Sequence, residues 1–265
     1  MTHAQSFHAL HTAPQILVLP NAWDAASAAM MSDAGAKAVA TSSAAVAWAH
    51  GYPDGDLLPL PILFAAIAEA ARASKVPLTA DIEGGYTDDL VELAEVIRGV
   101  IGAGAIGINL EDGSRDADLH ASKVAAARVA AEGAGVNLFI NARIDVYLRG
   151  LATGEAALAE TLRRAVIYER AGASGIFVPG PNDPELIGTL AREISLPLNI
   201  MSRAGVPKAS ALQDLGVRRL SSATGLFRAA YGALARATEA YLRDGDPDAL
   251  AAAGSGVPDL NARFA

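Results

Sequence analysis

Residues 103–112 read Ala-Gly-Ala-Ile-Gly-Ile-Asn-Leu-Glu-Asp, and this stretch contains the pattern that determines the fold. Gly104 follows an alanine-rich helical segment, where a glycine can end a helix in the left-handed conformation. The largely apolar run Ile106–Leu110 comes next and is typical of a buried parallel strand. Similar helix-ending triplets occur three more times: Ala34-Gly35-Ala36, Ala171-Gly172-Ala173 and Leu215-Gly216-Val217.

Short apolar runs alternate with helical stretches along the whole chain. The eight runs are Ile16–Leu19, Ala38–Thr41, Pro77–Ala80, Ile106–Leu110, Asn137–Ile140, Gly175–Val178, Leu196–Ile200 and Val217–Leu220. Eight such units predict an α/β protein, a TIM (β/α)8 barrel. The alternative is an open doubly wound sheet, which would lack its usual phosphate signature because no Gly-x-Gly-x-x-Gly follows the first strand. We expect one barrel domain over residues 1–249 and a C-terminal tail over residues 250–265.

The composition excludes several classes of protein. The 265 residues carry a net charge of −8, and 52% of them are hydrophobic, so neither a disordered polyelectrolyte nor a nucleic-acid or anionic-membrane binder is expected. With no cysteine, the chain has no disulfide, thiolate zinc site, iron–sulfur cluster or cysteine nucleophile. We see neither a membrane-spanning segment nor a signal peptide, and expect a cytoplasmic protein.

Acidic residues follow two neighbouring predicted strands. Asp81 and Glu83 come after the third run and are two residues apart, so they point to one face of an extended strand. Such carboxylates repel each other unless a cation lies between them. Glu111 follows the next strand and adds a third carboxylate at the barrel mouth. This set of oxygen ligands suits Mg²⁺, which keeps several of its waters. The alternative is that the three acids are solvated or cap helices.

Other polar residues also follow the predicted strands. Arg143 follows the fifth run, where it would bind either the acids or a substrate carboxylate in bidentate fashion. Ser42 and Ser43 end the second strand and could hold an anion with hydroxyl and backbone N–H groups, or could simply cap a turn. Asn199, in the seventh run, is a weaker candidate of the same kind. His120 lies in a predicted loop near the mouth, where most histidines are simply solvated.

The order and spacing of these residues resemble the phosphoenolpyruvate mutase/isocitrate lyase superfamily over about residues 7–242. The motifs that carry the resemblance are Pro20–Ala25, Thr41–Ser43, Gly51–Asp54, Asp81–Tyr86, Asn109–Asp112 and Asn141–Asp145. Three residues depart from the family's pattern. Ser43 stands where glycine is common, Glu83 replaces the second aspartate of the metal motif, and Ile144 replaces a threonine.

The resemblance implies a Mg²⁺-dependent barrel, with Mn²⁺ as a possible substitute, assembled as a homotetramer whose C-terminal helix is swapped between subunits. It implies that Asp81 contacts the metal and that Asp54, Glu83 and Glu111 hold the metal's waters. It also implies that Ser42, the amides of Ser43 and Ala44, and Arg143 grip the substrate carboxylate, with Asp81 and Asn199 also lining the substrate site. The shared chemistry is an enolpyruvate intermediate, whose negative charge the metal and Arg143 would stabilise.

The departures from the family's pattern narrow the range of reactions that we expect. The isocitrate and methylisocitrate lyases carry a cysteine in the loop after the fourth strand, and here residues 112–120 contain none. Phosphonate enzymes keep a lysine and an asparagine in that loop, where this chain has Arg115 and, further on, Lys123. Our leading hypothesis is therefore a carbon–carbon lyase or decarboxylase that acts on a small 2-oxo or 2-hydroxy dicarboxylate such as oxaloacetate.

The expected catalytic residues of this lyase are Arg143, Glu111 and His120. The proton donor is left open between His120, Tyr86, His50 and water. The first alternative function is a phosphonopyruvate mutase or hydrolase. The second is a non-catalytic paralogue that binds a 2-oxo acid.

Overall fold

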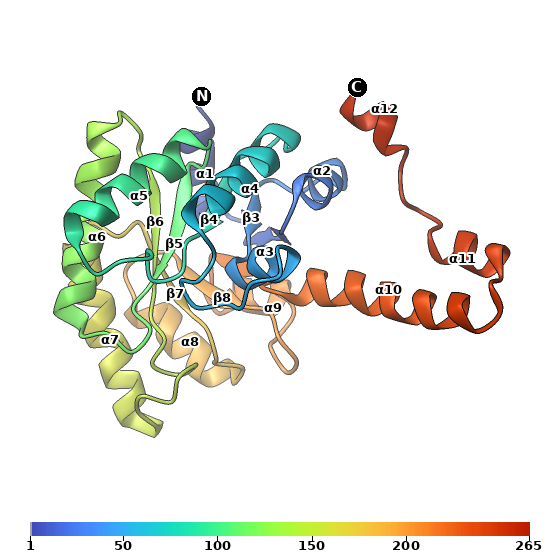
Figure 1. Cartoon of the computed structure of the whole chain (residues 1–265). Helices are drawn as coiled ribbons and strands as arrows, with labels where there is room; N and C mark the ends of the chain where they lie inside the picture. Colours follow the sequence, from blue (N-terminus) through green and yellow to red (C-terminus); the bar gives the residue numbers. More distant parts are fainter. Residues whose placement is uncertain (1) are drawn as a thin grey trace.

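The computed structural model describes residues 2–265, and a single parallel sheet forms the centre of the molecule (Figure 1). The strands are β1 (Leu17–Leu19), β2 (Asn21–Ala22), β3 (Val39–Thr41), β4 (Leu78–Asp81), β5 (Gly107–Glu111), β6 (Phe139–Arg143), β7 (Gly175–Val178), β8 (Leu198–Met201) and β9 (Arg219–Ser221). They are ordered β1-β9-β8-β7-β6-β5-β4-β3-β2, and every pair is parallel. Each of the eight predicted runs overlaps a strand.

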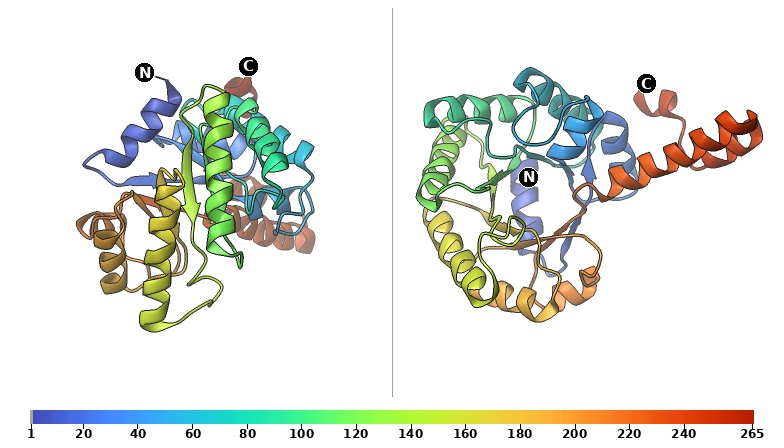
Figure 2. Two further views of the ribbon diagram at one scale, coloured as in Figure 1. Left: turned by 90° about the vertical axis from the view of Figure 1, so that its left-hand side faces the viewer. Right: turned by 60° about the horizontal axis from the view of Figure 1, so that its bottom comes forward.

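Twelve helices lie in residues 2–265, and most of them cover the outside of the ring of strands (Figure 2). They are α1 (His3–Thr12), α2 (Ala25–Asp33), α3 (Ser43–Ala49), α4 (Leu60–Ala73), α5 (Leu90–Gly102), α6 (Ala117–Gly133), α7 (Gly154–Arg170), α8 (Pro184–Glu193), α9 (Ala209–Asp214), α10 (Gly225–Asp244), α11 (Pro247–Ala253) and α12 (Leu260–Phe264). None of the helices in residues 2–265 is long and apolar enough to cross a membrane.

Pro20 explains why nine strand segments make an eight-membered barrel. β1 and β2 lie on either side of this proline, which has no N–H group to donate to a ladder. β1 pairs with β9, and β2 pairs with β3. The two segments are thus halves of one first strand that joins the ends of the sheet. The predicted TIM barrel is confirmed.

The four helix-ending glycines adopt the expected conformation. Gly35, Gly104, Gly172 and Gly216 have φ values of 94°, 100°, 102° and 98°, in the region that residues with a Cβ rarely adopt. Each one therefore ends a helix and turns the chain into the next strand.

Helix α1 closes the end of the barrel where the strands begin, as the right-hand view of Figure 2 shows. The Phe7 ring is fully buried and packs edge-on against Phe139 of β6, with ring centroids 5.3 Å apart. His11 stacks on the same Phe139 ring at 3.9 Å. Gly107 makes room for this plug, because a Cβ there would lie 3.1 Å from Phe7 Cε1 and 2.8 Å from Thr79 Oγ1.

The C-terminal helices leave the barrel instead of covering it. Helix α10 extends away as an arm (Figure 1). Its first turn is held by Phe227, whose ring packs against Trp23 and Trp48. The segment we expected to be a tail contains α12 and most of α11, each with an aspartate at its N-cap. Arg263 of α12 returns to the body of the protein and pairs with Asp33 of α2.

Candidate active site at the barrel mouth

The predicted carboxylates lie at the C-terminal ends of β4 and β5. Asp81 ends β4 and is 8% exposed, and Glu111 ends β5. The backbone N–H of Asp81 donates to Thr41 Oγ1 at 2.9 Å, which ties β4 to β3. Glu83 follows with a φ of 52°, a strained value for a residue with a Cβ. Backbone strain of this kind is concentrated at functional sites.

The loop between α3 and α4 covers Glu83. Glu83 Oε2 accepts hydrogen bonds from the backbone N–H groups of Gly55 and Asp56, and its Oε1 accepts one from the Tyr86 hydroxyl at 3.2 Å. Asp54 precedes this contact, and its charge acts on both Glu83 and Asp81. The structure therefore brings the four predicted metal-site acids to one region of the mouth.

Burial disfavours the charged forms of these acids. It raises the pKa of Glu83 to about 7 and that of Glu111 to about 8, and it raises the pKa of Asp81 and Asp54 as well. Neighbouring negative charges add to the effect. A divalent cation would offset both the cost of burying the charged carboxylates and the repulsion between them. The carboxylate oxygens therefore fit the expected Mg²⁺.

The geometry restricts how a metal could be held. Within residues 2–265 no three Asp, Glu or His side chains are close enough to coordinate one ion together. The expected arrangement, in which Asp81 binds the ion directly and the other acids act through its waters, needs no such group of three. Mg²⁺ commonly keeps several waters in this way.

Arg143 ends β6 and lies beside the acids. Its Nη1 is 2.6 Å from Glu111 Oε2, and its Nε and Nη2 donate to Asp145 at 2.7 and 3.1 Å. These carboxylates hold the pKa of Arg143 above its ordinary value, although burial opposes them. Arg149 adds a weaker contact to Glu111 at 3.4 Å. The sequence left the partner of Arg143 open between the acids and a substrate carboxylate. In the described structure the guanidinium pairs with the acids, and it lies close to the barrel mouth.

A buried network that we did not predict supports Arg143. Asp112 is fully buried and accepts hydrogen bonds from Arg164 at 2.7 Å and Tyr168 at 2.8 Å. Its other oxygen accepts from the backbone N–H of Asp145 at 2.9 Å, which fixes the residue that orients Arg143. The adjacent pair Arg163–Arg164 suggests a solvated face or a subunit contact from the sequence alone, but the Arg164 side chain is buried. The available signal was its four-residue spacing from Tyr168 on one face of α7.

The predicted anion-binding residues lie between β3 and α3. Ser42 is the N-cap of α3 but makes no capping hydrogen bond with its side chain, and Ser43 and Ala44 form the first turn. All three are buried. The Ser43 hydroxyl interacts with Asp54, which links this turn to the carboxylates. The turn therefore lies beside the acids.

Asn199 and His120 are placed differently from the other candidates. Asn199 lies inside the barrel on β8, and neither of its side-chain polar atoms has a hydrogen-bond partner among the described residues. His120 lies on α6 rather than in a loop, fully buried, with its ring 4.6 Å from that of Tyr168. Burial lowers the pKa of His120 to about 3, so the ring is neutral near pH 7. No contact in the described structure joins it to the carboxylates.

The short loop after β5 is fixed by ion pairs. Arg115 binds Asp56 at 3.4 Å and Asp88 at 2.6 Å. Lys123 of α6, whose side chain is fully buried, binds Asp88 at 2.7 Å and the Thr87 carbonyl at 2.7 Å. Arg115 and Lys123 therefore tie the loop after β5 to the loops that contain Asp56 and Asp88.

A closed parallel barrel with buried acids and an arginine at its C-terminal mouth is an architecture typical of α/β-barrel enzymes. The family model for phosphoenolpyruvate phosphomutase matches residues 7–242, and the chain belongs to that family. The predicted superfamily is thereby confirmed. Known members of the superfamily are lyases and mutases, which supports the prediction that this chain is an enzyme.

Several similar proteins match most of this chain. A protein of Mycobacterium tuberculosis (strain ATCC 25618 / H37Rv) is 36% identical over 236 residues, covering 87% of this chain and 88% of the relative. The oxaloacetate decarboxylase of Pseudomonas fluorescens (strain SBW25) is 27% identical over 241 residues, covering 85% and 80%. A candidate phosphonomutase from Burkholderia cenocepacia J2315, known from a crystal structure, is 42% identical in sequence. The two structures match with a TM-score of 0.86, over 89% of this chain and 99% of the other.

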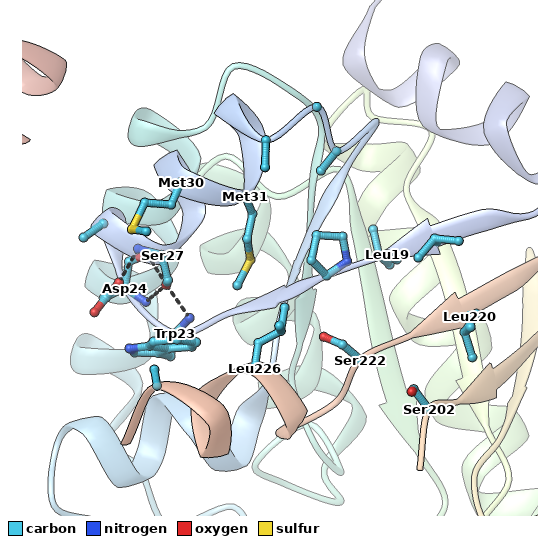
Figure 3. Close-up of a pocket in the computed structure, with 17 residues that line it drawn as sticks. Leu19, Trp23, Asp24, Ser27, Met30, Met31, Ser202, Leu220, Ser222 and Leu226 are labelled. Atoms are coloured by element: carbon cyan, nitrogen blue, oxygen red, sulfur yellow. Dashed lines mark hydrogen bonds between the residues drawn. The ribbon is translucent and has the colours of Figure 1, made fainter. Parts of the chain in front are cut away.

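A large apolar pocket lies away from the carboxylates. It has a volume of about 760 Å³ and lies between β1, α2 and the start of α10 (Figure 3). Leu19, Met30, Met31 and Leu226 line it, together with Val18, which is 55% exposed although it lies in a strand. An eighth covering helix would close this face, but α10 extends away from it.

Proposed function

We propose that the protein is a Mg²⁺-dependent carbon–carbon lyase that acts on a small 2-oxo or 2-hydroxy dicarboxylate, with oxaloacetate decarboxylation as the simplest case. The observation that carries this proposal is the buried acid cluster of Asp81, Glu83 and Glu111 beside Arg143. The similarity to an oxaloacetate decarboxylase over most of both chains supports it. The absence of cysteine is compatible with it, because decarboxylation requires no thiol acid.

The roles of the residues follow from charge. A bound Mg²⁺ would act as a Lewis acid at the substrate's carboxylate and 2-oxo oxygens. When the C3–C4 bond breaks and CO₂ leaves, the electron pair moves to the 2-oxo oxygen, and the Arg143 guanidinium stabilises that charge. The turn of Ser42, Ser43 and Ala44 would hold the substrate carboxylate through hydroxyl and N–H groups.

The last step is protonation at C3, which gives pyruvate. Tyr86 is better placed than His120 to take part, because its hydroxyl contacts Glu83 inside the cluster. Burial and the Glu83 charge raise the pKa of Tyr86, so its phenol keeps its proton near pH 7. We propose that Tyr86 and Glu83 supply this proton, and His120 remains an untested candidate.

The test is oxaloacetate consumption with Mg²⁺, followed by proton NMR. Asp81→Ala provides the background, because Mg²⁺ alone slowly decarboxylates oxaloacetate. Glu69→Ala is the matched control, since Glu69 is exposed on α4 outside the cluster. We expect pyruvate from the wild type and from Glu69→Ala well above the Asp81→Ala rate. Equal rates in all three proteins would refute the decarboxylase proposal.

Phosphonate chemistry is the second candidate, and the similarity to a candidate phosphonomutase favours it. A change in the phosphorus NMR spectrum of phosphonopyruvate, dependent on Asp81, would identify this reaction. Tight binding of a 2-oxo acid without turnover of either substrate would instead identify the non-catalytic paralogue.

We also propose that the protein is a homotetramer in which α10 of one subunit covers the apolar pocket of another. The exposed strand residue Val18 and the exposed apolar side chains Leu234 and Leu242 of α10 support this. The test is the molar mass in solution, measured by light scattering. Leu234→Glu should reduce the mass, whereas Val129→Glu, an exposed change on α6, should not. A wild-type monomer would refute the assembly.

A further inference from the structure

A charged residue lies inside the barrel beneath the proposed active site. Arg219 of β9 is fully buried, and its neighbour in register on β8 is Asn199. Its Nη2 donates to Asn109 Oδ1 at 3.2 Å. Its Nε and Nη1 have no hydrogen-bond partner among the described residues. The adjacent pair Arg218–Arg219 suggests a solvated face or a subunit contact from the sequence alone, but Arg219 is fully buried.

This arginine is a poor contributor to stability. A buried guanidinium that makes one hydrogen bond keeps much of its desolvation penalty. No carboxylate within residues 2–265 forms a salt bridge with Arg219. Burial lowers the pKa of Arg219 to about 9, and the negative charge that opposes this shift belongs to Asp81. An apolar side chain of similar length would fill the position at lower cost, so the charge itself needs an explanation.

Asn109 contacts Arg219 and is the register neighbour of Asp81. Asn109 lies opposite Asp81 on one side and opposite Asn141 on the other, in register across β4, β5 and β6. Asn109 Oδ1 accepts from both Arg219 and Asn141 Nδ2, the latter at 2.9 Å. Both partners donate, so the amide cannot flip without placing its own donor group against them. Its NH₂ group is therefore directed toward Asp81, with which the Asn109 side chain interacts.

We propose that Arg219 is a positioning residue of the active site, which fixes the Asn109 amide and places a buried positive charge beneath Asp81. This rests on the proposed function, in which Asp81 binds the divalent cation. Arg219 touches neither substrate nor metal, and it acts on Asp81 through Asn109 and through its charge. Its removal should weaken metal binding without destabilising the fold.

The experiment measures metal affinity and stability on the same full-length proteins. Mn²⁺ alone is the probe, because free Mn²⁺ is counted directly by electron paramagnetic resonance. Arg219→Met should weaken Mn²⁺ binding about tenfold or more, while the metal-free protein melts at or above the wild-type temperature. Arg219→Lys keeps the charge and should recover part of the affinity. The matched control is Arg218→Met, since the one hydrogen bond of the Arg218 side chain within residues 2–265 goes to the Ala13 carbonyl, at 3.4 Å.

The outcomes separate this inference from the proposed function. Wild-type protein that does not bind Mn²⁺ would refute the proposed metal site, and this inference with it. If the wild type binds and Arg219→Met binds equally well, the inference alone fails. A lower melting temperature with unchanged affinity would also overturn it, because that is the behaviour of a merely structural residue. If Arg219→Met does not fold, Asn109→Ala tests the same link and should weaken Mn²⁺ binding, and unchanged affinity would refute it.

Discussion

Replacing Tyr168 by phenylalanine should destabilise the protein through the loss of one hydrogen bond. The Tyr168 hydroxyl donates to the fully buried Asp112 at 2.8 Å, and Arg164 and the Asp145 N–H supply that carboxylate's other hydrogen bonds. A hydrogen bond to a charged group contributes about 1.5–3 kcal/mol. The phenyl ring would keep its contact with His120, so little packing is lost. We therefore expect the free energy of unfolding to fall by about 2 kcal/mol.

Thermal and urea unfolding at one fixed protein concentration would measure this loss, because assembly makes stability concentration-dependent. For a chain of 265 residues, a loss of this size lowers the melting temperature by about 4 °C. Val166→Ala is the control, since Val166 is 44% exposed on α7, and it should change stability by less than about 0.5 kcal/mol. A Tyr168→Phe protein as stable as this control would refute the view that Asp112 is an ionised acceptor that needs the phenol.

Three further predictions concern the acids, Arg143 and α1. Folding raises the pKa values of Glu83 and Glu111 to about 7 and 8, from an unfolded value of 4.5. Between pH 4.5 and these raised values the folded state therefore binds more protons than the unfolded state. The stability of the metal-free protein should thus fall as pH rises from about 5 to about 8. Melting curves would show the fall, which Glu83→Gln should reduce; stability that rises over this range would contradict the prediction. Arg143→Lys should raise KM about tenfold or more, because an ammonium cannot form the bidentate fork, and an unchanged KM in steady-state kinetics would remove Arg143 from substrate binding. Phe7→Ala should cost about 3–5 kcal/mol in urea unfolding, and a loss near zero would show that α1 does not seal the barrel.

The fold was predictable because its signals are local and repeated. A glycine at a helix end, such as Gly104, and an apolar run directly after it require no knowledge of distant residues. The boundaries were less accurate where a strand contains charge. We expected the last strand over Val217–Leu220, but it covers Arg219–Ser221. Two adjacent arginines there resembled surface residues, since a sequence does not show that one of them points into the barrel.

The site was predictable as a set of residues but not as a network of contacts. Asp81, Glu83 and Glu111 were identifiable because carboxyl ends of parallel strands meet at one edge. The links from Asp112 to Arg164, and from Arg219 to Asn109, join residues 52 and 110 positions apart. Such contacts depend on register and burial, which one sequence does not display. His120 was misplaced for a related reason, since the short loop before it ends one turn earlier, at the N-cap Asp116.

The closure of the barrel by β1 and β9 has a consequence for the order of folding. Leu17–Leu19 pair with Arg219–Ser221, so the ring cannot close until nearly the whole chain has left the ribosome. Pairings between such distant segments form slowly, because a long loop must close first. The same closing strand carries Arg219. The positive charge beneath Asp81 therefore arrives with the last strand. A nascent chain that lacks β9 should hold the acid cluster with Arg143 but without the second positive charge of Arg219.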